Sequence, residues 1–123
     1  MSEQRYRTAA YVRVSTEDQT VSLESQIRHF NEVMDTTPHM VNCGIYVDNG
    51  ISGRYLNRRE AFLQMLTDCE LGLVDRILCK SIKRFGRNTL DIVRAIARLT
   101  ELKVSVYFEQ ENIDTLKDRN NII

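Results

Sequence analysis

The residues with the clearest potential for chemistry are one serine and three arginines. Ser15 follows a short apolar segment and stands two residues after Arg13, while Arg84 and Arg87 lie three residues apart in a basic segment far along the chain. A serine hydroxyl is a weak nucleophile at neutral pH and needs a neighbouring base or a positive field. Guanidinium groups stay charged at ordinary pH and match phosphate oxygens, so three of them favour a phosphodiester substrate over an acyl group.

A histidine-assisted serine site has weaker support. His29 falls within a predicted helix and His39 near a turn, so neither belongs to the loops that hold the unusual polar residues. The basic segment 80–87 also fits a solvated turn when it is considered alone. Its function therefore depends on which elements bring it to Ser15.

Apolar periodicity predicts the elements that position these residues. Ser22 is a candidate N-cap, Gly72 a natural helix end, and Asn88 with Thr89 a candidate helix start. We expect Leu63 to lie on the apolar side of its helix, with Phe62 and Met65. The predicted strands are 8–14, 40–47, 75–79 and 103–108, and the predicted helices are 22–34, 59–71 and 88–102.

Regular alternation of strands and helices predicts an α/β domain with three layers, in which helices flank a mostly parallel sheet of four to five strands. The site is then expected at the carboxyl ends of the strands, in loops 15–21, 48–58 and 80–87. Since the first strand and the loop after the third are typically neighbours, Arg13, Arg84 and Arg87 would converge near Ser15. After Phe108 the sequence becomes polar, and no further periodic segment is predicted.

Composition limits the partners. The 123 residues include 17 basic and 17 acidic side chains, which suits one domain and argues against a generally basic nucleic-acid binder. Any contact with phosphate is therefore local. No apolar run approaches the ~20 residues of a membrane helix, which predicts a cytoplasmic protein without a membrane partner. The three cysteines, Cys43, Cys69 and Cys79, are expected to be buried reduced thiols.

Four separated motifs carry a family resemblance. They are YVRVSTEDQ at 11–19, SLESQ at 22–26, DNGISG at 48–53 and KSIKRFGRNTLD at 80–91. Together they resemble the resolvase/invertase family of serine recombinases over residues 6 to 115. The spacing is most similar to the large serine recombinases and transposon-borne enzymes. The resemblance implies a resolvase-like catalytic domain over 1–123, with the family's oligomerisation helix and DNA-binding region missing.

The resemblance implies a mechanism without metal or nucleotide cofactors. Ser15 would attack a DNA phosphodiester and become linked to the 5′ phosphate, releasing a 3′ hydroxyl. Arg13, Arg84 and Arg87 match the catalytic arginines of the family. The implied partner is double-stranded DNA, bound by the full-length protein as a homodimer that forms a tetramer in the synapse.

Further positions match residues around the family's active site. Gln26, Ser52 and Arg59 match supporting positions, although the neighbouring Arg58 fits the Arg59 match as well. Tyr11 matches a tyrosine near the site, and packing in the core explains it equally well. Asp48 belongs to the DNGISG motif and is included among the substrate-binding candidates.

Lys83 is the main departure from the family pattern. It stands where small resolvases carry an acidic residue linked to proton transfer, and a lysine adds phosphate affinity without replacing a carboxylate. An alternative is therefore a catalytically impaired, truncated relative that acts in regulation or subunit pairing. A flavodoxin-like or nucleotide-binding domain is a weaker alternative, since the sequence has neither GxGxxG nor a P-loop.

Overall fold

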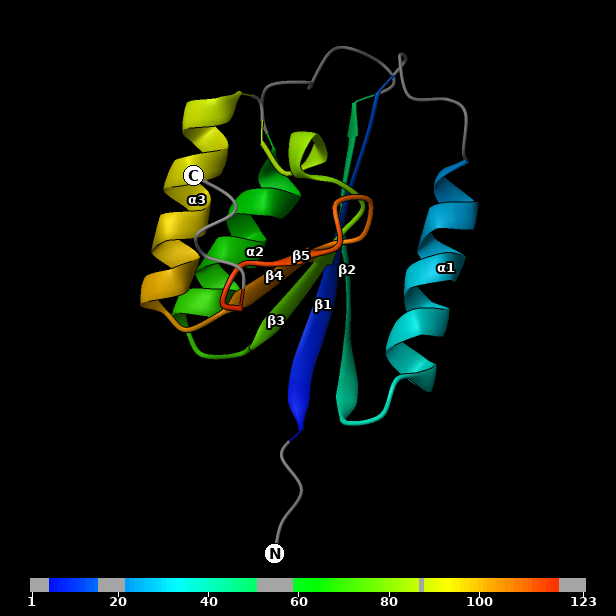
Figure 1. Ribbon diagram of the computed structural model, residues 1–123. Helices are drawn as coiled ribbons and strands as arrows, with labels where there is room; N and C mark the ends of the chain where they lie inside the picture. The colour runs from blue at the N-terminus through cyan, green and yellow to red at the C-terminus, as the bar shows by residue number, and fades with distance from the viewer. Residues whose placement is uncertain (1–4, 16–21, 51–58, 87, 118–123) are drawn as a thin grey trace, which may run out of the picture.

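A computed structural model describes residues 5–15, 22–50, 59–86 and 88–117 (Figure 1). The strands and helices alternate as the sequence predicts, with one short 3-10 helix, η1, inserted after the third strand. In chain order the elements are β1 (Tyr6–Ser15), α1 (Leu23–Thr36), β2 (Met40–Gly50), α2 (Glu60–Glu70), β3 (Arg76–Cys79), η1 (Ile82–Arg84), α3 (Thr89–Glu101), β4 (Ser105–Phe108) and β5 (Ile113–Asp114).

One five-stranded sheet organises these elements in the order β2-β1-β3-β4-β5. β1 pairs in parallel with both β2 and β3, β3 pairs in parallel with β4, and β5 is antiparallel to β4. In Figure 1, α1 lies on one side of the sheet and α2 and α3 lie on the other. The predicted three-layer, mostly parallel α/β fold is confirmed.

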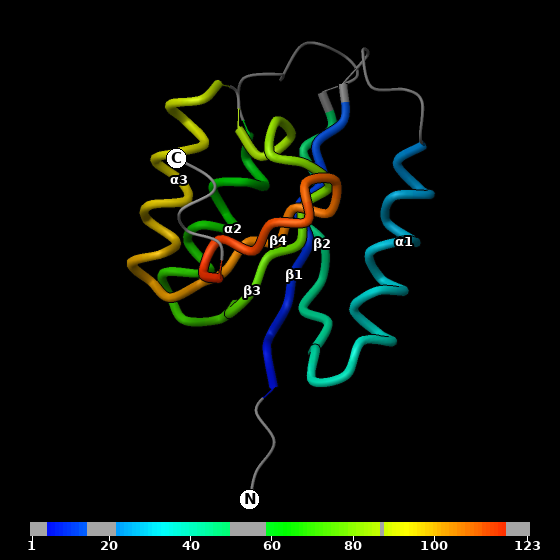
Figure 2. Tube along the Cα trace, viewed as in Figure 1, coloured from blue at the N-terminus to red at the C-terminus, as the bar shows by residue number. Residues whose placement is uncertain are grey.

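The carboxyl ends of β1, β2 and β3 lie at one end of the sheet. Ser15, the last residue of β1, is in register with Gly50, the last residue of β2. Cys79, at the end of β3, is in register with Tyr11. The chain that leaves β3 therefore runs beside the last residues of β1, near Arg13. Figure 2 shows η1 and the start of α3 at this same end. Parallel pairing thus gathers the polar loops.

Among the differences from the sequence prediction, two concern polar segments. Asp48 to Gly50 belong to β2 rather than to a loop, because β1 offers pairing partners as far as Ser15. The polar segment after Phe108 contains β5, whose Ile113 is in register with Phe108. This strand has two residues, too few to show an alternating pattern.

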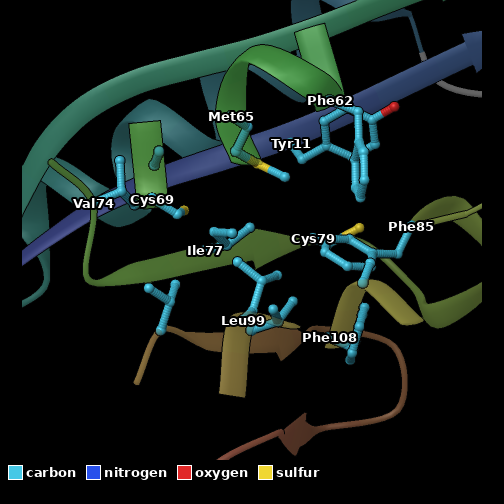
Figure 3. Close-up of a cluster of buried hydrophobic side chains, with 14 residues drawn as sticks. Tyr11, Phe62, Met65, Cys69, Val74, Ile77, Cys79, Phe85, Leu99 and Phe108 are labelled. Carbon is cyan, nitrogen blue, oxygen red and sulfur yellow. The ribbon is translucent and has the colours of Figure 1, made fainter. Parts of the chain in front are cut away.

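The core has two parts because successive β1 side chains point to opposite faces of the sheet. Ala10, Val12 and Val14 pack under α1 with Phe30 and Met34. On the other face, Ala9 and Tyr11 join a larger cluster under α2 and α3, shown in Figure 3. The most deeply buried members of this second cluster include Met65, Ile77, Phe85, Leu99 and Phe108.

Exposure corrects two expectations from the sequence. Leu63 is 58% exposed although Met65, on the same helix, is fully buried. Its position one residue from the buried Phe62 places it about 100° around α2, beyond the edge of the buried side. Cys43 is exposed as well, because it lies on the edge strand β2, whereas Cys69 and Cys79 are buried as expected. The described helices include none with the length and apolar character needed to cross a lipid bilayer.

The three thiols are predicted to react differently. Burial raises the pKa of the Cys69 thiol to about 12 and that of the Cys79 thiol to about 12. At pH 8 both are protonated, so a thiolate-specific reagent should titrate one cysteine per folded chain quickly, at Cys43, and all three after denaturation. The absorbance of the coloured thiol that the reagent releases gives the number of cysteines that have reacted. Rapid reaction of a thiol in the folded Cys43→Ser variant would contradict the assignment of the fast cysteine to Cys43.

The same raised values set a pH dependence for stability. Unfolded thiols ionise near pH ~8.5, whereas the folded thiols stay neutral up to about pH 12. Their contribution to stability is therefore complete below the unfolded pKa and is lost as pH rises toward the folded value. Cys69→Ala and Cys79→Ala should each reduce this alkaline loss, as measured by urea unfolding at pH 8 and pH 10.

Candidate active site

Arg13 and Arg84 hold each other through backbone carbonyls. Arg13 donates from Nε to the Arg84 carbonyl at 3.4 Å and from Nη2 to the Lys83 carbonyl at 3.2 Å. In return, Arg84 Nη1 donates to the Arg13 carbonyl at 3.3 Å. The predicted approach of these two arginines is confirmed. A backbone carbonyl orients a guanidinium group without itself carrying a negative charge, so this reciprocal contact ties the two arginines together at the end of β1.

Three of the predicted catalytic or binding groups lie outside the described parts of the chain. Arg87 and Ser52 fall in the undescribed ranges, and for Ser15 only the backbone is described. That backbone ends β1 two residues beyond Arg13. The approach of the Ser15 hydroxyl to the arginines remains a prediction.

η1 carries Arg84 and is anchored to the core by the next residue, Phe85. The Arg84 amide donates to the Ser81 carbonyl at 3.2 Å, and the Phe85 amide donates to the Ile82 carbonyl at 3.0 Å, which closes the turn. The Phe85 ring is fully buried and meets Tyr11, Phe62 and Phe108 edge to face. Figure 3 shows Phe85 in this cluster, close to Cys79 and Phe108.

Gly86 lets the chain pass close to the start of α3. A Cβ at this position would lie 2.6 Å from Ile92 Cγ1 and 2.9 Å from Asp91 Oδ2. The Asn88 side chain caps α3 by accepting from the Asp91 amide at 2.9 Å, which confirms the predicted helix start. The turn with Arg84 and the amino end of α3 are thus packed together.

Asp48 supports the site from the end of β2. Its carboxylate accepts from the Ala61 amide at 2.9 Å, from the Phe62 amide at 3.1 Å and from the Tyr11 hydroxyl at 2.7 Å. The N-cap position of α2 is Arg59, whose side chain offers no acceptor, so Asp48 caps the helix from a distant strand. Burial, and then the hydrogen bond to Asp48, raises the pKa of Tyr11, which therefore stays protonated.

Arg59 is buried rather than presented to solvent, with 7% of its surface exposed. Its guanidinium donates to Asp91 Oδ2 at 2.5 Å and to the Phe85 carbonyl, and it lies 3.7 Å over the ring of Phe62. Its backbone adopts the left-handed conformation, with φ of 46°. Arg59 therefore joins α2, the turn after η1 and α3, and its described contacts give it a positioning function.

The two remaining candidates lie in different surroundings. Gln26 is buried on the inner side of α1, next in helical spacing to Phe30 and Met34, and so packs on the sheet face opposite Phe85. Lys83 has an exposed side chain on η1, and its carbonyl accepts from Arg13. Among the described residues, no group of three His, Cys, Asp or Glu side chains is arranged to hold a metal ion.

Comparison with known proteins places this arrangement in a family. The model of the resolvase N-terminal domain matches residues 8–123. The chain belongs to the resolvase family. A curated resolvase/recombinase from Pseudomonas putida is 28% identical over 109 residues, which are 89% of this chain and 54% of that protein. The chain thus spans about half the length of this relative.

Solved structures agree in fold. A resolvase family site-specific recombinase from Streptococcus pneumoniae is 26% identical, with a TM-score of 0.80 over 96% of this chain and 81% of that one. The N-terminal catalytic domain of TP901-1 integrase is 26% identical, with a TM-score of 0.76 over 94% and 86%. The resolvase family chain therefore has the fold of serine recombinase catalytic domains, and the integrase agrees with the expected likeness to large serine recombinases.

The network around Asp48 predicts a graded loss of stability. Asp48→Ala removes the cap of α2 and leaves the buried Tyr11 hydroxyl without its partner, at an expected cost of about 2–4 kcal/mol. Tyr11→Phe removes only one of the three hydrogen bonds and should cost about 0.5–1.5 kcal/mol. Urea denaturation with a constant m-value measures both. Equal costs for the two variants would show that the cap contributes nothing.

Proposed function

We propose that this chain is the catalytic domain, 1–123, of a site-specific recombinase that cuts and rejoins double-stranded DNA through Ser15. The observation that carries the proposal is the Arg13–Arg84 contact at the carboxyl end of β1, two residues before Ser15. Two arginines that are tied together in this way offer several N–H donors to the oxygens of one phosphate. Membership of the resolvase family supports the same substrate.

The proposed reaction exchanges one phosphoester for another. The Ser15 oxygen attacks phosphorus and loses its proton, the bond from phosphorus to the 3′ oxygen breaks, and that oxygen takes up a proton. The products are a 5′-phosphoserine linkage and a free 3′ hydroxyl, and rejoining reverses the step with the 3′ end of another strand. No cofactor takes part in this proposal.

Arg13, Arg84 and Arg87 act on the phosphate in this proposal. Charge on the non-bridging oxygens increases in the transition state, and fixed positive groups stabilise it most strongly where water is excluded. Arg84 is suited to this because only 9% of its surface is exposed. Lys83, with its exposed side chain, would add attraction to the DNA backbone, and no proton transfer is assigned to it.

The complete protein is proposed to act as a dimer on each site and as four subunits in the synapse. This chain spans about half the length of the curated relative, and the other half of that relative is long enough to hold an oligomerisation helix and a DNA-binding region. Ser52 and Gln26 are proposed to complete the surroundings of the phosphate. Asp48, Tyr11 and Arg59 are proposed to hold the loop with Arg84 in place.

Ser15→Ala in the complete recombinase is expected to bind its site with unchanged affinity and to form no covalent adduct with DNA. Adduct is measured on a denaturing gel with a plasmid that carries two sites. Ser25→Ala, which changes an exposed serine on α1, is the matched control and should cut normally. Adduct formation by Ser15→Ala would disprove the assignment. Absence of adduct from the unchanged protein would favour the regulatory, catalytically impaired alternative.

Arg84→Lys tests the phosphate contact. Lysine keeps the positive charge but lacks the planar set of N–H donors, which in arginine can bond the Arg13 carbonyl and the proposed phosphate at the same time. Cleavage at saturating DNA should slow by at least about 100-fold. Arg94→Lys, an exposed arginine on α3, is the control and should cut at the unchanged rate. An equally active Arg84→Lys would show that charge alone suffices.

A further inference from the structure

The loop with Arg84 is held from a second side by the turn after β4. The Glu109 amide donates to the Cys79 carbonyl at 3.0 Å, and the Gln110 amide donates to the Lys80 carbonyl at 2.8 Å. These bonds continue the pairing of β3 with β4 beyond the ends of both strands. In Figure 2 the orange turn after β4 lies beside the segment that follows β3.

The next residue, Glu111, makes the third contact of this series through its side chain. Its Oε1 accepts from the amide of Ile82, the first residue of η1, at 3.1 Å. The Ile82 amide lies at the start of the 3-10 turn, where an N–H group has no partner within the turn itself. Glu111 thus fixes the point at which η1 begins, two residues before Arg84.

The turn that presents Glu111 is itself well defined. Asn112 adopts a left-handed conformation, with φ of 54°, which asparagine tolerates better than most residues. Its Oδ1 accepts from the Tyr107 hydroxyl at 2.7 Å, and its amide donates to the Glu109 carbonyl at 3.3 Å. Glu109 also contacts His29 Nε2 at 2.7 Å, which connects the turn to α1.

We infer that Glu111 is a positioning residue for Arg84: by accepting from the Ile82 amide, its carboxylate sets the register of η1 and thereby the meeting of Arg84 with Arg13. The inference rests on the proposed function. Displacement of Ile82 would move the Ser81–Arg84 and Ile82–Phe85 turn bonds together, because η1 is only three residues long. Phe85 would still hold the far end of the turn in the core.

The test compares Glu111→Ala with Glu111→Gln in the complete recombinase. Loss of the acceptor should slow adduct formation at saturating DNA by about five- to tenfold, with unchanged affinity for the site. Glutamine keeps an oxygen acceptor without charge and should restore most of the rate. Glu101→Ala, an exposed glutamate at the far end of α3, is the control and should cut normally.

A second readout does not depend on cleavage. Hydrogen exchange of the Ile82 amide in the present chain should become faster in Glu111→Ala and stay near the original rate in Glu111→Gln. Unchanged cleavage and unchanged exchange in Glu111→Ala would overturn the inference. Equally slow cleavage by both variants would also overturn it, because the charge rather than the acceptor would then matter. If the unchanged recombinase forms no adduct, the proposed function fails, and exchange alone decides the effect of Glu111 on η1.

Discussion

The pairing of β1 with two parallel neighbours is the constraint on which the rest of the molecule depends. Because β2 and β3 run in the same direction as β1, the chain leaves all three strands at one end of the sheet. The register of β1 with β3 ends at Tyr11 and Cys79, so the last residues of β1 extend past β3. Arg13 there meets the carbonyls of η1 rather than those of a strand. A polar site is thereby built on a strand whose other residues form the core.

A buried layer supports the two arginines. Phe85 fixes η1 to the core, Arg59 joins the carbonyl of Phe85 to Asp91, and Asp48 joins β2 to α2 and Tyr11. The Asp48 carboxylate and the two terminal nitrogens of Arg59 have polar partners within the protein, which is how buried polar side chains are normally stabilised. Rigid support of this kind suits electrostatic catalysis, because donors that are already oriented need little reorganisation when charge develops.

The sequence predicts the fold well because its signals are local. Apolar periodicity, Ser22 and Asn88 as N-caps and Gly72 as a helix end all depend on nearby residues, and the structure confirms each of them. β5 and the last three residues of β2 depend instead on pairing partners that are distant in the chain, and the apolar pattern of the sequence does not reveal such partners. The same difference applies to the site. The approach of Arg13 and Arg84 follows from strand order, but the distant cap by Asp48 and the buried state of Arg59 follow from tertiary packing.

The contact between Asp48 and the start of α2 joins the sheet directly to a helix. The carboxylate accepts from the amides of Ala61 and Phe62, so the last residues of β2 and the first turn of α2 are held against each other. Changes in the intervening residues would therefore leave this junction between β2 and α2 intact, because Asp48 and two backbone amides form it. One carboxylate thus sets the position of the helix relative to the sheet, independently of the segment that connects them.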